Sequence, residues 1–123
     1  MREISKAEME VYRRTARERQ ALKEEKLANR MEQARSVATA AAAWLRQNYD
    51  VEQVWLFGSL VHKQWFTMTS DIDLAIAQLA PNDYWLAVAR LQDISPDFKV
   101  DLVRLDSIPD SFKNAIMSES EAL

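Results

Sequence analysis

Residues 54–76 read VWLFGSLVHKQWFTMTSDIDLAI, and this stretch decides the fold. Its apolar start ends at Gly58, which is the only glycine in the chain, and Ser59 follows directly. Glycine lets a chain turn sharply and approach a ligand closely, because no Cβ stands in the way. The serine hydroxyl and the backbone N–H groups lie at what we expect to be a helix start, which suits a phosphate. By itself, however, Gly-Ser after a strand is also typical of an ordinary turn.

Two aspartates near the end of the same stretch carry more information. Asp71 and Asp73 are two residues apart in an alternating run, so both carboxylates project from one face of the expected strand. Two such charges repel each other and raise each other's pKa unless a cation lies between them. Magnesium prefers hard oxygen ligands of this kind. The alternative is that both carboxylates are solvated at the rim of a sheet.

A third acid, Asp101, lies in the apolar run VDLV at residues 100–103. A carboxylate there is costly unless it is exposed at an edge or meets a cation. If this strand lies beside the one that carries Asp71 and Asp73, three carboxylates converge near the glycine turn. Such an arrangement suits phosphoryl or nucleotidyl transfer, in which metals bind the triphosphate and one acid accepts the proton of the nucleophile.

The surrounding sequence predicts a single α/β domain, a short mixed β-sheet flanked by helices. Apolar and alternating runs predict three strands, at residues 51–57, 71–77 and 98–105. Helices are predicted at residues 81–93, where proline opens the helix, and at residues 109–118. Trp55 and Trp85 are interpreted as core residues.

The first 48 residues contain no glycine or proline and are rich in strong helix formers. Ser5 and Glu8 fit a capping box. We expect a docked helix at residues 27–48, preceded by an exposed helical extension, and we divide the chain into this extension (1–30) and a catalytic domain (31–123). A continuous helix would be about 65 Å long, so its early part is expected to fold back or to reach a partner. The expectation of a docked helix rests on apolar residues that recur at helical spacing: Leu22, Leu27, Met31, Ala34, Val37, Ala38, Ala41 and Leu45.

Composition excludes several classes of site. The chain has no cysteine, so disulfides and thiolate metal sites are excluded, and one histidine argues against structural zinc. The net charge is −3 with a pI near 5.2, so no general basic field favours direct nucleic-acid binding. The sequence shows neither a signal peptide nor a membrane span, and a cytoplasmic location is expected.

The motif resembles that of the polymerase-β-like nucleotidyltransferase superfamily. The resemblance rests on Gly58-Ser59, on SDIDLA at residues 70–75 and on Asp101 in the next strand. The small size is similar to the minimal nucleotidyltransferases (MNT), antitoxins that accompany HEPN ribonuclease toxins. The resemblance implies a mixed sheet flanked by helices, two magnesium ions and a nucleoside triphosphate donor. For the antitoxin branch it implies transfer of AMP from ATP to a tyrosine of a HEPN toxin, within a hetero-oligomer.

The resemblance also implies roles for individual residues. Gly58 and Ser59 would hold the phosphates of the donor, Asp71 and Asp73 would bind both metals, and Asp101 would bind the catalytic metal and help deprotonate the incoming hydroxyl. The chain departs from the usual pattern in its spacer, residues 60–70, which is one residue longer and lacks the usual glycines and arginines. The charged N-terminal extension is likewise not part of the minimal core.

Some alternatives stay open at this point. Lys63, His62 and Trp65 could contact the nucleotide. The more common outcome is a surface position for Lys63 and a structural or solvent role for His62. Trp65 could also anchor a partner, but packing of its loop onto the core is the expected outcome. The chain could instead neutralise its partner by binding alone, or transfer a nucleotide to a small molecule. The latter enzymes usually carry a further domain for the acceptor, and only about 20 residues follow the third strand here.

Overall fold

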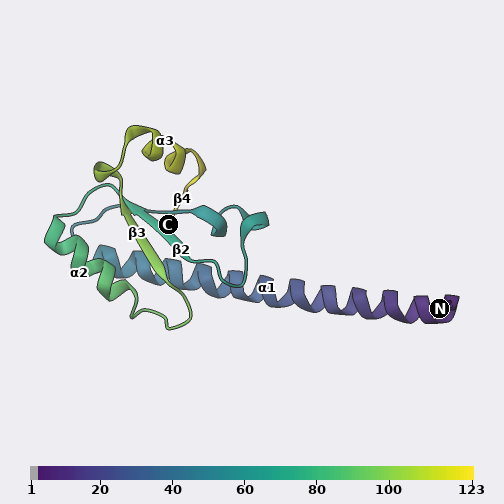
Figure 1. Cartoon of the computed structure of the whole chain (residues 1–123). Coiled ribbons are helices and arrows are strands. Elements are labelled where there is room, and N and C mark those ends of the chain that lie inside the picture. Colours follow the sequence, from purple (N-terminus) through teal and green to yellow (C-terminus); the bar gives the residue numbers. More distant parts are fainter. Residues whose placement is uncertain (1–2) are drawn as a thin grey trace.

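The computed structural model describes residues 3–123, which form one long helix and a small α/β domain built against its C-terminal half (Figure 1). The strands are β1 (Val54–Phe57), β2 (Ile72–Ile76), β3 (Val100–Arg104) and β4 (Glu121–Ala122). The helices are α1 (Lys6–Asn48), α2 (Pro81–Leu91) and α3 (Asp110–Glu119).

The four strands form a mixed sheet in the order β3-β2-β1-β4. β1 pairs antiparallel with β2 and with β4, whereas β2 and β3 run parallel. The prediction of a short mixed sheet flanked by helices is therefore confirmed. The predicted strands are one to three residues too long at their ends, and β4 was not predicted because two residues give no detectable alternation.

One face of the sheet forms the core of the domain. Alternate residues of β1, β2 and β3 point to this face and are fully or almost fully buried: Val54, Leu56, Ile72, Leu74, Ile76, Val100 and Leu102. They pack with a stripe of small residues on α1, namely Ala34, Ala38, Ala41 and Ala42, and with Leu45. Alanine side chains let the helix lie close to the sheet, so a domain of this size can still close its core.

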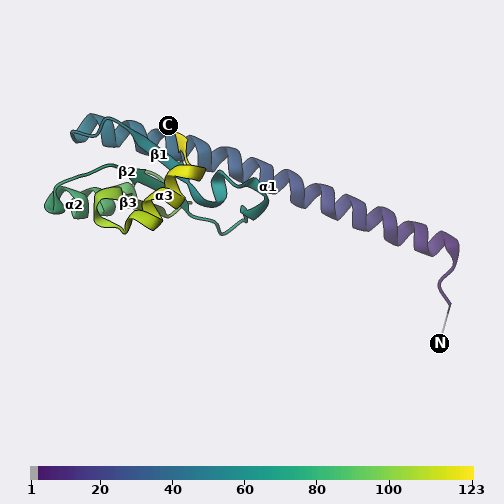
Figure 2. The same cartoon turned by 90° about the horizontal axis from the view of Figure 1, so that it is seen from above.

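Helix α1 is continuous over 43 residues, or about 65 Å at 1.5 Å per residue. The predicted cap is present, because Ser5 Oγ accepts a hydrogen bond from the Glu8 amide (3.1 Å). Residues 6–26 bury no side chain, and this half projects away from the domain in both views without folding back (Figures 1 and 2). The helix has no break at residue 30. Our division of the chain there therefore separates an exposed part of one helix from the part that packs on the domain.

Within residues 3–123, no helix combines the length with the apolar content that a membrane span requires.

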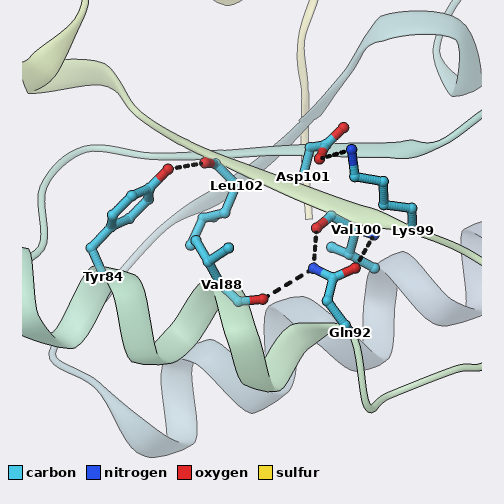
Figure 3. Close-up of polar contacts among 7 residues, drawn as sticks. All are labelled: Tyr84, Val88, Gln92, Lys99, Val100, Asp101 and Leu102. Atoms are coloured by element: carbon cyan, nitrogen blue, oxygen red, sulfur yellow. Dashed lines mark hydrogen bonds and ion pairs between the residues drawn. The ribbon is translucent and has the colours of Figure 1, made fainter.

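Helix α2 covers the free edge of β3 with two side chains (Figure 3). The Tyr84 hydroxyl donates to the carbonyl of Leu102 (2.8 Å). The Gln92 amide accepts from the Val100 N–H (3.2 Å) and donates to the Val100 carbonyl (2.6 Å). Gln92 therefore takes the place of a neighbouring strand, which satisfies backbone groups that an open edge would leave unpaired.

Two tryptophans differ from their predicted positions. Trp85 was predicted to lie in the core, but 68% of it is exposed. The prediction was wrong because the buried residues of α2, Ala87 and Leu91, lie roughly 200° and 240° around the helix from Trp85. Trp55 is only half-buried, since it belongs to the face of β1 opposite the core.

The segment after Gly58 also differs from prediction. A helix was expected there, but the chain forms two short 3₁₀ turns, Gly58–Leu60 and Lys63–Trp65. Leu60 and Phe66 are both buried in the core. On an α-helix these two residues would lie about 120° apart, and the two short turns direct both of them into the core instead.

Candidate active site

The second face of β2 and β3 carries the acidic residues that the sequence singled out. Asp73 of β2 is the register partner of Asp101 of β3, so the two carboxylates project side by side from parallel strands. Asp71 lies two residues before Asp73 and therefore emerges on the same face. All three residues are half-buried, in contrast to the fully buried leucines and isoleucines on the opposite face. The structure thus brings Asp71, Asp73 and Asp101 together, as the sequence predicted.

Gly58 joins this group from the end of β1. Phe57 is the register partner of Asp73, so Gly58 begins its turn directly beside that carboxylate. Its φ of +79° is in the left-handed region, which side-chain-bearing residues rarely adopt. A Cβ at this position would lie far inside contact distance of Asp73 Oδ2. Both the backbone angle and the space therefore require glycine.

The carboxylate of Asp73 is held in an electrostatically unfavourable place. Burial, followed by the negative charges of Asp101 and Asp71, raises the pKa of Asp73 from 3.8 to about 6, and Lys99 partly opposes this increase. Like charges that are kept close together in a folded protein often mark a site for a cation or for proton transfer.

A lysine that the sequence analysis missed belongs to the same face. Lys99 Nζ lies 3.4 Å from Asp101 Oδ1, and the two side chains point toward each other on one side of β3 (Figure 3). The signal was available, because Lys99 precedes Asp101 by two residues and must share its face in an extended strand. The lysine was overlooked because it lies just outside the apolar run that drew attention to Asp101.

These carboxylates form a suitable donor set for magnesium but not a finished coordination shell. Among residues 3–123, no group of three acidic or histidine side chains is drawn closely enough together to hold a metal as it stands. The donor chemistry nevertheless fits, because hard carboxylate oxygens that repel one another are what a divalent cation stabilises. Rotation about the side-chain bonds of these half-buried carboxylates would change the spacing of their oxygens.

The turn after β1 places Ser59 next to the carboxylates. The carbonyl of Gly58 accepts from the amides of Val61 and His62, both at 3.1 Å, which closes the turn. Ser59 itself is half-buried. This is the geometry in which a glycine-rich turn can present N–H groups and a hydroxyl to a phosphate.

Three nearby residues lie differently. His62 Nε2 is 3.0 Å from Glu119 Oε2 of α3, a contact that becomes an ion pair when the histidine is protonated. Its ring also lies against Trp65, with centroids 4.5 Å apart, and 60% of Trp65 is exposed. Lys63 borders a surface hollow of about 650 Å³ with residues of α1. Structural or surface roles therefore describe His62 and Lys63 in this structure.

The chain enters β2 through a tight turn of small polar residues. The amide of Thr67 donates to Ser70 Oγ (2.9 Å), and the amide of Ser70 donates to the carbonyl of Thr67 (3.2 Å). Ile72 then donates to the carbonyl of Lys99 (2.9 Å), which begins the pairing with β3. Asp71 is thus fixed between a hydrogen-bonded turn and the first hydrogen bond to the neighbouring strand.

Comparison with known families gives a match over most of this domain. Residues 40–123 match the sequence model of the family described as polymerase beta, nucleotidyltransferase. The match includes Gly58, Ser59 and the three aspartates. No curated protein sequence matches the chain significantly.

Two solved structures resemble the fold. One is a crystal structure of a toxin–antitoxin with AMP-PNP, with 25% identity and a TM-score of 0.57, covering 71% of this chain and 69% of the other. The second is a tyrosine-to-alanine mutant of the toxin–antitoxin MntA-HpeT, with 30% identity and a TM-score of 0.53. That alignment covers 64% of each chain, so this chain spans just under two thirds of the second relative.

Proposed function

The chain belongs to the polymerase beta nucleotidyltransferase family, and we propose that it is an antitoxin that transfers AMP from ATP to a tyrosine of a cognate HEPN ribonuclease toxin, with magnesium. The observation that carries this proposal is the convergence of Gly58, Asp73 and Asp101 at the ends of three neighbouring strands. The likeness to toxin–antitoxin structures, one of them with the ATP analogue AMP-PNP, supports the choice of donor and partner.

In this proposal Asp71 and Asp73 would hold two magnesium ions, and Asp101 would hold one of them. The ions would neutralise charge on the triphosphate and increase the acidity of the acceptor hydroxyl. Gly58 lets the backbone approach the phosphates, because a side chain there would collide with Asp73. Ser59 would donate its hydroxyl to a phosphate oxygen.

The transfer itself balances simply. The acceptor oxygen forms a bond to the α-phosphorus as the bond from that phosphorus to the bridging oxygen breaks, and pyrophosphate leaves. Asp101 would accept the proton of the acceptor hydroxyl, since its side chain is 40% exposed and the register places it beside Asp73. In-line positioning of the acceptor is the contribution that a protein partner would supply by docking.

The test is to incubate the chain with ATP, magnesium and a co-expressed HEPN partner and to measure the intact mass of that partner. We expect an increase of one or more AMP units. The increase should be absent with Asp71→Asn/Asp73→Asn and retained with Asp93→Asn, which removes an exposed acid outside the site. An unchanged mass with the wild-type chain, despite a stable complex, would rule out protein adenylylation.

A second function, neutralisation by binding alone, is favoured by one observation. The N-terminal half of α1 exposes Met9, Val11 and Tyr12 on a stretch of helix, residues 6–26, that buries no side chain in the domain. Such a helix is suited to gripping a partner. If Asp71→Asn/Asp73→Asn still protects cells from the toxin, binding alone is sufficient.

A further inference from the structure

The acidic face carries a cation of its own, Lys99, at the position where β3 begins. Its ammonium lies 3.4 Å from Asp101, and both side chains retain access to solvent, 65% and 40% respectively. Water or dissolved ions can therefore replace either partner of this ion pair easily. It is not a buried structural salt bridge.

The backbone fixes Lys99 beside all three carboxylates. Its carbonyl accepts a hydrogen bond from Ile72, which is the residue between Asp71 and Asp73. Ile72 of β2 is the register partner of Val100 of β3. One residue earlier on both strands, Lys99 therefore lies opposite Asp71. Alternation then directs its side chain to the face of Asp101, as the close-up shows (Figure 3).

The negative charge on this face favours a neighbouring cation when no metal is bound. Three aspartates contribute three negative charges, and Lys99 supplies one positive charge within reach of them. A divalent ion at the same carboxylates would meet the lysine as a like charge. Lysine and metal therefore compete for the same oxygens.

We propose that Lys99 is an internal counter-cation that pairs with the carboxylates of the metal-free protein, weakens the binding of metal alone, and so makes metal binding depend on the nucleotide. The dependence follows because a triphosphate brings several negative charges, which can balance both the metals and the lysine. The inference rests on the proposed function, since it assumes that this face binds metal and nucleotide.

The experiment measures Mn²⁺ affinity of the 123-residue chain by electron paramagnetic resonance, without nucleotide. Lys99→Gln removes the charge, Lys99→Arg retains it, and Lys113→Gln removes an exposed charge from α3 as a matched control. We expect Lys99→Gln to bind Mn²⁺ about 3- to 10-fold more tightly than wild type, because one positive charge is removed from a largely solvated site for a divalent ion. The other two variants should stay within about twofold of wild type.

A second measurement adds a non-hydrolysable ATP analogue. The advantage of Lys99→Gln should then fall below about twofold, because the triphosphate takes over the neutralisation of Lys99. Thermal unfolding of the metal-free variants shows that each is folded, and Lys99→Ala repeats the test with a shorter side chain.

The outcomes separate this inference from the proposed function. Equal or weaker Mn²⁺ binding by both Lys99→Gln and Lys99→Ala, with AMP transfer by the wild-type chain intact, overturns the role of Lys99 alone. Absence of Mn²⁺ binding and of AMP transfer in every protein overturns both. Tighter binding by Lys99→Arg as well would also overturn it, because the charge would then not be the cause.

Discussion

Strands β2 and β3 present two unlike faces, and the contrast shows how one sheet serves both stability and chemistry. On one face Ile72, Leu74 and Val100 are fully or almost fully buried against the helices. On the other, Asp73 and Asp101 lie side by side without enough positive charge to balance them. The first face stabilises the fold, whereas the second costs stability that a bound cation would restore.

The largest effect on stability should come from a substitution on the apolar face of the sheet. Leu74→Ala removes a fully buried side chain from the central part of the sheet and leaves a cavity. We expect a loss of about 2–5 kcal/mol in the free energy of unfolding, measured by urea denaturation. Trp85→Ala, at an exposed position of α2, is the matched control and should cost far less. A similar cost for both variants would mean that the two positions are equally packed.

Gly58→Ala changes the turn beside Asp73, and it should have the next largest effect on the free energy of unfolding. The new Cβ faces both an unfavourable backbone angle and the Asp73 carboxylate. Together these should cost about 2–4 kcal/mol in unfolding free energy and reduce AMP transfer by displacing Asp73. Ser59→Ala, with the same turn, should keep the stability and lose part of the nucleotide affinity. Wild-type stability in Gly58→Ala would show that the turn can relax.

Gln92→Ala removes a side-chain amide that both donates and accepts a hydrogen bond. The Asp73 carboxylate, by contrast, lies among like charges. The variant leaves the N–H and C=O of Val100 without their partner on the edge of β3. We expect a loss of about 1–2 kcal/mol, because one backbone N–H and one C=O lose their hydrogen-bond partner. Hydrogen exchange of the Val100 amide should accelerate. Gln47→Ala, on the exposed side of α1, serves as the control; an unchanged exchange rate at Val100 would contradict the role of Gln92.

Asp73→Asn should have the smallest effect on stability, and the opposite sign. Because burial and its acidic neighbours raise the pKa of Asp73 to about 6, the folded protein holds this proton more tightly than the unfolded chain, whose value is near 3.8. The contribution of this group to stability is therefore favourable at low pH and is lost as the pH rises from about 4 through 6. At pH 7.5 and without metal, Asp73→Asn should be about 1 kcal/mol more stable than wild type, after allowance for partial solvation.

Thermal unfolding between pH 4 and 8 measures this change. The wild-type curve should fall more steeply with rising pH than that of Asp73→Asn, and Asp93→Asn should follow the wild type. Magnesium should stabilise the wild type more than Asp73→Asn, because binding to the folded state raises its stability. Lower stability of Asp73→Asn at pH 7.5 would show that the carboxylate is stabilised by partners other than Lys99.

The sequence predicted the elements of this site because each rests on a local signal. Alternation around Asp71 and Asp73 placed both on one face of a strand, and the apolar residues flanking Asp101 made its charge conspicuous. The single glycine marked the turn between them. Residue 48 was correctly predicted as the end of the long helix, and proline marked the start of α2. The roles of the five site residues in binding and catalysis remain predictions.

Other features depended on contacts between distant residues. Two short turns replace the expected helix after Gly58, and they direct both Leu60 and Phe66 into the core. Trp85 turned outward because α2 docks through Ala87 and Leu91, and only the docked arrangement shows which side of a helix is covered. Local periodicity does not contain that information.

By itself, the sequence determined which side chains are candidates for the chemistry and roughly where the main strands and helices lie, because periodicity and turn residues act over a few positions. The tertiary structure alone decided that β3 lies parallel to β2 with Asp101 opposite Asp73, that Lys99 lies beside Asp101, and that the first half of α1 projects away from the domain. Those features follow from register and packing, which are set by contacts between segments far apart in the chain.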